Sequence, residues 1–186
     1  MTRIIAGSAG GRRLLVPPGQ ATRPTSDRVR EALFAALQAR GLIDGARVLD
    51  LYAGSGALGL EAASRGAASV VLVESAKEAL AAIRRNLTTL ALPGVSVVAA
   101  PVEQYLNAGV RTGVVDLVLL DPPYAQTQDE LGAVLAALAD QGWLAEHAVV
   151  LVERSRRSDE PAWPPALERH GERRYGETTV WWAQHC

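Results

Sequence analysis

The chain has 186 residues, of which 48% are hydrophobic and 21% are charged, and its formal net charge is −1. These values fit one globular domain with its own core and exclude a disordered chain. No apolar stretch reaches the roughly 18 residues that cross a bilayer, and the N-terminus lacks the apolar segment of a signal peptide. The one cysteine, Cys186, excludes an internal disulfide and a cysteine-cluster metal site. We therefore expect a cytoplasmic protein without a membrane partner.

Arginines are concentrated near the N-terminus. Residues 1–30 hold six arginines and one acidic residue, Asp27. Within them, two short extended runs at 3–6 and 12–16 flank a glycine-rich turn, which predicts a β-hairpin. The guanidinium group is a planar fork that suits phosphate, so this segment is either an RNA-binding arm or a solvated flank.

The rest of the chain alternates strands with helices. A helix is predicted over 26–39, because Val29, Leu33 and Leu37 recur at helical spacing. A second apolar helical stripe runs from Ala76 to Leu90. Five apolar runs predict strands at 47–51, 69–74, 95–99, 115–120 and 148–153. Apolar strands that alternate with helices indicate a parallel sheet covered on both faces.

Capping and turn signals mark several boundaries. Ser75 with Glu78, and Thr127 with Glu130, have the spacing of a capping box at a helix start. Near the C-terminus, a loop over 155–165 is followed by an antiparallel hairpin at the sheet edge, with strands at 167–174 and 178–183. We divide the chain into an N-terminal hairpin arm, 1–25, and a main domain, 26–186.

A glycine loop follows the first predicted strand. Gly54-Ser55-Gly56-Ala57-Leu58-Gly59 opens a helix, and such glycines allow a ligand to approach the backbone closely. Glu74 closes the next strand 20 residues after Gly54, where a carboxylate accepts both ribose hydroxyls of an adenosine group. Asp50 lies just before the loop and would repel a pyrophosphate, whereas it would stabilise the ammonium and sulfonium of S-adenosylmethionine. The pattern therefore favours S-adenosylmethionine over a dinucleotide.

Further donor contacts are expected around this loop. The adenine is expected near Val102, through its backbone, or near Glu103. The expected cofactor-binding residues are Asp50, Tyr52, Gly54, Ser55, Gly56, Glu74, Ser75, Val102 and Asp121.

The tetrapeptide Asp121-Pro122-Pro123-Tyr124 follows the fourth predicted strand. Its prolines stiffen the backbone, so that a planar NH2 group could donate to the Asp121 carboxylate and to the Pro122 carbonyl while Tyr124 stacks on the attached ring. A proline turn with a solvated aspartate is the structural alternative. In a doubly wound sheet the first and fourth strands adjoin at the switch point, so the methyl donor and the amine are expected to face each other.

Together these motifs resemble the bacterial 16S ribosomal RNA guanine-N2 methyltransferases, the RsmD family. The stretches that carry the resemblance are Arg3-Ile4-Ile5-Ala6-Gly7, Thr22-Arg23-Pro24-Thr25, Arg28, Arg30-Glu31-Ala32-Leu33-Phe34, the glycine loop, Ser64-Arg65-Gly66-Ala67 and the tetrapeptide. The resemblance implies an α/β class I S-adenosylmethionine-dependent methyltransferase fold. That fold is Rossmann-like, with a seven-stranded, mostly parallel sheet, an antiparallel last strand and an N-terminal β-hairpin extension.

The resemblance also implies a function and its residues. The chain would act as a monomer and methylate the N2 of one guanine in 16S rRNA, within a small-subunit ribosomal particle. The catalytic residues would be Asp121, Pro122 and Tyr124. The substrate-binding residues would be Arg12, Arg13, Arg23, Thr25, Arg28, Arg30, Pro123 and Tyr124. No metal is expected, because the chain's three histidines, His147, His170 and His185, are scattered.

Other functions remain open at this point. An adenine-N6 methyltransferase acting on RNA or DNA would present the same NH2 geometry to the tetrapeptide. A release-factor glutamine methyltransferase would have asparagine in place of Asp121. A non-catalytic RNA-binding module would have no use for the complete set of motifs. The tetrapeptide by itself does not distinguish guanine from adenine.

Overall fold

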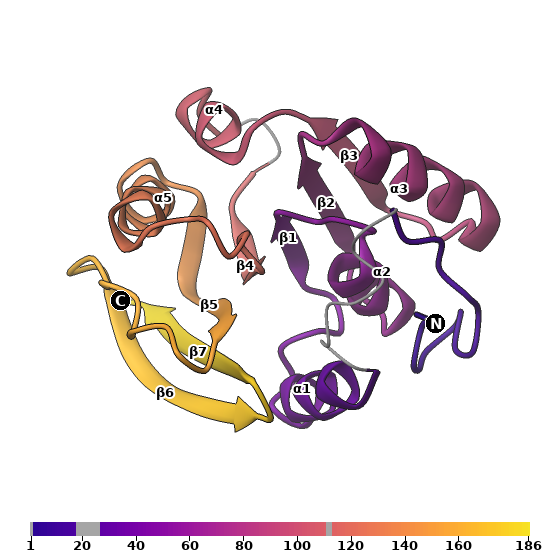
Figure 1. The fold of residues 1–186 in the computed structure, drawn as a ribbon, viewed down its shortest axis with the longest axis horizontal. Helices are drawn as coiled ribbons and strands as arrows, with labels where there is room; N and C mark the ends of the chain where they lie inside the picture. Colours follow the sequence, from indigo (N-terminus) through magenta and orange to yellow (C-terminus); the bar gives the residue numbers. More distant parts are fainter. Residues whose placement is uncertain (1, 18–26, 111–112) are drawn as a thin grey trace.

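The computed structural model describes residues 2–17, 27–110 and 113–186. A seven-stranded sheet has the strand order β3-β2-β1-β4-β5-β7-β6 (Figure 1). Strands β1 to β5 are parallel, and β7 is antiparallel to both of its neighbours. This confirms the predicted mostly parallel sheet with an antiparallel last strand. The strands are β1 (Arg47–Leu51), β2 (Ser69–Glu74), β3 (Val95–Ala99), β4 (Val115–Leu120), β5 (Leu144–Ser155), β6 (Leu167–Tyr175) and β7 (Thr178–His185).

Helices cover both faces of the sheet (Figure 1). They are α1 (Asp27–Ala39), α2 (Ala57–Ser64), α3 (Lys77–Leu90), α4 (Val102–Asn107) and α5 (Gln128–Asp140). Successive side chains of a strand point to opposite faces. Accordingly, Val48 and Leu117 pack in the cluster with α1, α2 and α3, whereas Leu49 and Val118 pack in the cluster with α4 and α5.

The strand boundaries agree closely with the sequence pattern. The first four strands have the predicted bounds. The fifth strand is longer than the predicted 148–153, since it runs from Leu144 to Ser155. Its length follows from its position, because β4 pairs with it on one side and β7 extends an antiparallel ladder to Ser155 on the other.

One of the two predicted capping boxes is correct. The hydroxyl of Thr127 accepts the backbone N–H of Glu130, whose side chain accepts the N–H of Thr127 in return. The other is wrong, because α3 begins after Ala76 and has no side-chain cap. Instead, Glu74 at the end of β2 accepts the backbone N–H groups at positions 75 and 76, at 2.7 and 2.8 Å.

The N-terminal segment folds back on itself, but over a shorter length than predicted. A single antiparallel bridge joins Arg3 to Arg13 in place of two full strands. The bridge is flanked by a hydrogen bond of 2.9 Å from the N–H of Ile4 to the carbonyl of Arg12. The predicted domain boundary between residues 25 and 26 lies outside the described residues.

This segment is packed against the body of the protein. Ile4 and Leu14 are buried in the cluster with α1, α2 and α3. The buried carboxylate of Glu61 on α2 accepts the N–H groups of Ile5 and Ala6, at 2.7 and 3.1 Å. The N-terminal segment is therefore fixed to the helix that follows the glycine loop.

Two further observations complete the fold. Trp143 is fully buried and Trp181 nearly so, and both side chains therefore pack in the interior. Among the residues that the structure describes, no helix combines the length and the apolar character needed to cross a bilayer.

Candidate active site

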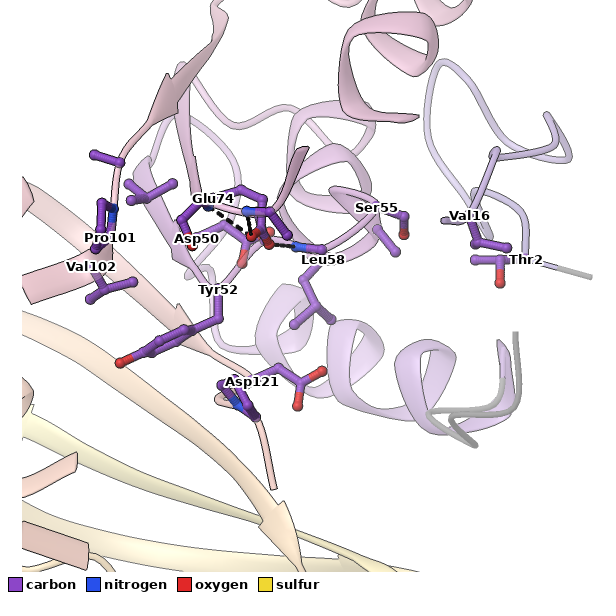
Figure 2. A pocket seen from close by; sticks show the side chains of 18 of the residues that line it. Thr2, Val16, Asp50, Tyr52, Ser55, Leu58, Glu74, Pro101, Val102 and Asp121 are labelled. Carbon is purple, nitrogen blue, oxygen red and sulfur yellow. Dashed lines mark hydrogen bonds between the residues drawn. The ribbon is translucent and has the colours of Figure 1, made fainter. Parts of the chain in front are cut away.

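A cavity of about 370 Å³ lies at the carboxyl ends of β1, β2 and β4. Open parallel sheets bind their ligands at this edge, and the volume is in the range of small-molecule sites. In the view of Figure 2, Thr2 and Val16 lie at one end and Pro101 and Val102 at the other, with Asp50 and Glu74 between them. Most of the residues predicted to bind S-adenosylmethionine line this cavity: Asp50, Tyr52, Gly54, Ser55, Glu74, Ser75, Val102 and Asp121.

Glu74 holds the glycine loop in place. One carboxylate oxygen, Oε2, accepts the N–H of Gly54 at 2.8 Å. The other, Oε1, accepts the two N–H groups at the start of α3. Three backbone N–H groups hold this carboxylate in a fixed position in the cavity wall, where it can accept hydrogen bonds from a ligand hydroxyl.

Asp50 lies beneath the loop and is 1% exposed. Its Oδ2 accepts the N–H of Gly59 at 2.8 Å. Burial raises the pKa of Asp50 to about 7, the nearby Glu74 charge also raises it, and the Gly59 hydrogen bond opposes both effects. A cationic ligand in the cavity would favour the ionised form of this carboxylate.

Two glycines of the loop are required by its geometry. Gly56 has φ 80° and caps the N-terminus of α2, a conformation that side-chain-bearing residues rarely adopt. At Gly59, an added Cβ would lie 2.3 Å from Cδ2 of Leu72 and 3.0 Å from Oδ2 of Asp50. Helix α2 can therefore lie this close to the sheet only because position 59 has no side chain.

The predicted amine cradle adjoins this cavity. Asp121 and Pro123 line the cavity. Asp121 also lines an adjacent hollow, together with Pro122 and Tyr124. The side chain of Tyr124 is 66% exposed, so a flat ring has access to it. The structure thus brings the tetrapeptide and the glycine loop to one crevice, as their positions in the chain predicted.

Gln126 connects the two parts of the site. Its Nε2 donates to the Tyr52 hydroxyl at 2.7 Å, and its backbone N–H donates to the Pro123 carbonyl at 3.0 Å. The Gln126 carbonyl accepts from Nη2 of the buried Arg154 on β5, at 2.9 Å. Burial raises the pKa of Tyr52 to about 12, so its hydroxyl stays protonated.

The predicted RNA-binding arginines have different environments. Arg12, Arg13 and Arg28 are exposed, and the Arg12 guanidinium also donates to the Thr89 carbonyl. Arg23 and Thr25 lie outside the described residues.

Arg30, which was predicted to contact RNA, is almost fully buried in this structure. Its side chain is 2% exposed and lies 3.0 Å from Oδ1 of Asp27 and 3.8 Å from Oε2 of Glu61. Arg30 therefore pairs with acidic groups inside the protein, and it also contributes to the lining of the donor cavity.

Sequence patterns missed several residues of the site. Thr2 and Val16 line the cavity because the N-terminal segment folds over it. Asn86 on α3 holds that segment there, since its amide donates to the carbonyls of Leu15 and Ser55 at 2.9 and 3.0 Å. A lone asparagine on a helix gave no signal of this contact. Glu153 and Arg154 line the hollow near the end of β5. The sequence predicted that a strand ends there, but it did not predict that these side chains border the site.

Metal ligation has no candidate in the part of the chain that the structure describes. No group of three or more histidine, cysteine, aspartate or glutamate side chains there could hold an ion.

Comparison with known proteins identifies the family. A family model described as "Conserved hypothetical protein 95" matches residues 2–184. The chain is 39% identical to "Ribosomal RNA small subunit methyltransferase D" of Escherichia coli K12, over 94% of this chain and 85% of that protein. The chain belongs to the RsmD family.

Other relatives of the family agree in sequence and fold. "Putative rRNA methyltransferase YlbH" of Bacillus subtilis is 35% identical over 96% of both chains. The solved structure of a "Putative methyltransferase yhhF" from Escherichia coli superposes with a TM-score of 0.85. It has 36% identity and covers 99% of this chain and 97% of that one.

The methyltransferase names of the relatives support S-adenosylmethionine as the methyl donor. The cavity fits that group. It offers a fixed carboxylate for the ribose in Glu74 and a second, buried carboxylate for the cationic end in Asp50.

Proposed function

We propose that this RsmD-family chain methylates the exocyclic N2 of a guanine in 16S rRNA, with S-adenosylmethionine as donor and a small-subunit ribosomal particle as substrate. The observation that carries the proposal is the position of Asp121, which lines both the donor cavity and the hollow beside it. The names of the relatives, which describe ribosomal RNA methyltransferases of the small subunit, support the substrate class.

Two carboxylates and one backbone segment hold the donor in this proposal. Glu74 accepts hydrogen bonds from the ribose hydroxyls, and Asp50 faces the cationic end. The segment around Val102 and Glu103, which lines the cavity, contacts the adenine. When bound, S-adenosylmethionine supplies an electrophilic methyl group on a sulfonium.

Asp121 and the Pro122 carbonyl prepare the amine. The nitrogen lone pair of a guanine N2 is delocalised into the ring, which makes it a poor nucleophile. Two acceptors that take its N–H groups orient the nitrogen and stabilise the positive charge that develops on it. The amine needs no strong base, since it becomes acidic only as it gains the methyl group. It would then pass one proton to the Asp121 carboxylate, and S-adenosylhomocysteine would be the other product.

Tyr124 and the arginines position the RNA. A guanine stacked in a duplex is out of reach, so the base enters from a loop or by flipping. Stacking on the exposed ring of Tyr124 contributes about 1–3 kcal/mol. Arg12, Arg13 and Arg28 are exposed and contact the flanking phosphates in this proposal, together with Arg23 and Thr25.

Methyl transfer from tritiated S-adenosylmethionine tests the proposal. Small-subunit particles, naked rRNA, DNA and protein are offered separately, and the labelled product is digested and identified. We expect N2-methylguanosine from the particles. N6-methyladenosine, or label in DNA or protein alone, would contradict the proposal.

A further inference from the structure

We propose that Glu153 selects guanine by accepting the N1–H that lies beside the N2 amine. This inference rests on the proposed function and adds the residue that distinguishes guanine from adenine. It concerns the hollow next to the donor cavity, whose lining includes Asp121, Tyr124 and Glu153.

The strand register places Glu153 beside Asp121. Strands β4 and β5 are parallel and pair Leu119 with Leu151 and Leu120 with Val152. One step further along the same register, the neighbours are Asp121 and Glu153. Leu119 and Leu151 both pack in the cluster with α1, α2 and α3. Alternation along β5 directs Glu153 to that same face of the sheet, and Asp121, just beyond the end of β4, lines the same hollow as Glu153.

The burial of Glu153 indicates a functional group. It is 7% exposed, although it lies near the end of β5 and lines the hollow beside the donor cavity. Burying a carboxylate removes its hydration and is therefore costly, so a buried carboxylate in the wall of a cleft is a candidate for a functional role.

Two adjacent acceptors match the edge of guanine and not that of adenine. Guanine carries the N2 amine and the N1–H side by side, so its edge presents neighbouring donors. In adenine the N6 amine lies beside N1, which has a lone pair and no hydrogen. A carboxylate at Glu153 would accept the N1–H of guanine and repel the N1 lone pair of adenine. A site built to bond a donor rejects the analogue that lacks it, because its own polar group is then left unpaired.

A substrate with 2-aminopurine at the target position tests this role directly. This base keeps the 2-amine but has no hydrogen on N1. Reconstituted small-subunit particles carry either guanine or 2-aminopurine at the mapped site, and kcat/KM for methyl transfer is measured for both. We expect wild-type protein to prefer guanine by roughly 10- to 100-fold. In Glu153→Gln the guanine rate should fall and the preference should shrink to about threefold or less, because an amide donates to the bare N1 as readily as it accepts from N1–H.

Controls separate this role from folding and from the proposed function. S-adenosylmethionine affinity and unfolding temperature should be unchanged in Glu153→Gln, and Glu177→Gln, at an exposed position next to β7, should keep the full preference. An unchanged preference in Glu153→Gln, or none in the wild type, would overturn the role of Glu153 while leaving guanine methylation intact. Absence of any methyl transfer to guanine by the wild type would instead remove the proposed function.

Discussion

Glu74 and Gly54 are joined by a hydrogen bond of 2.8 Å, from the backbone N–H of the glycine to Oε2 of the carboxylate. The bond connects the end of β2 to the loop after β1. The Glu74 carboxylate, which is proposed to bind the ribose, therefore also holds the glycine loop in position.

Replacing Glu74 with glutamine should weaken donor binding. An amide has one oxygen that accepts, so it cannot replace both carboxylate oxygens towards the backbone N–H groups and the ribose hydroxyls. Hydrogen bonds to charged groups contribute about 1.5–3 kcal/mol. We expect the Kd for S-adenosylmethionine to rise roughly 10- to 100-fold, measured by calorimetry. Glu78→Gln, exposed on α3, is the control and should leave the Kd unchanged. Equal affinity in both variants would exclude the assigned role.

Asp50 should make the stability of the unliganded protein depend on pH. Its pKa is about 7 in the folded protein, against an ordinary 3.8, so the folded state holds the proton more tightly than the unfolded state. The free energy of unfolding should therefore fall as pH rises from about 4 to about 7 and level off above that. Denaturant unfolding across this range checks the sign, with Asp50→Asn as reference. A variant with the same pH dependence as wild type would contradict the assignment.

The affinity for S-adenosylmethionine should also depend on the ionisation of Asp50, but it should rise over the pH range in which the stability falls. A cationic donor stabilises the ionised Asp50, so affinity for S-adenosylmethionine should increase as pH rises towards and through 7. Calorimetry in buffers of different ionisation enthalpy should detect proton release near pH 6.5. Asp50→Asn should bind more weakly and lose this component.

Gly59→Ala should damage both stability and donor binding. Its Cβ would lie 2.3 Å from Cδ2 of Leu72, so α2 must shift away from the sheet. Overpacking of this kind costs about 1–3 kcal/mol of unfolding free energy. Gly132→Ala on α5 is the matched control: it meets nothing within 4 Å, and alanine should raise stability there by up to about 1 kcal/mol. Equal effects of the two substitutions would refute the steric argument.

Removing Arg13 and Arg28 together should weaken RNA binding in a salt-dependent way. Each is exposed and proposed to contact a phosphate. The slope of log affinity against log salt should fall by about one unit per arginine. Arg47→Ala is the control. Arg47 is the first residue of β1, at the end of the strand away from the donor cavity, and its guanidinium pairs with Asp116 at 2.7 Å. An unchanged salt slope in the double variant would remove the arm from the RNA interface.

The sequence predicted most of this architecture because local signals were consistent along the main domain. The strands β1 to β4 were bounded by their apolar runs. Asp50 near the end of β1 and Asp121 just after β4 were placed in one crevice because these strands adjoin. Long-range contacts had no such signal. Arg30 looked like part of a basic arm, but burial against Glu61 is a tertiary property. The neighbourhood of Asp121 and Glu153 likewise depends on the register between β4 and β5, which spacing along the chain does not reveal.

Asp121 is proposed to act on the N2 of a guanine at the mouth of the donor cavity. The most direct measurement is methyl transfer to small-subunit particles by wild type and Asp121→Asn, with product nucleosides identified and donor affinity measured in parallel. We predict N2-methylguanosine from the wild type, and at least a hundredfold slower formation in the variant, about 2.7 kcal/mol of activation free energy, with donor binding retained. Near-normal turnover by Asp121→Asn would show that Asp121 does not prepare the amine, and a product other than N2-methylguanosine would show that guanine N2 is not its target.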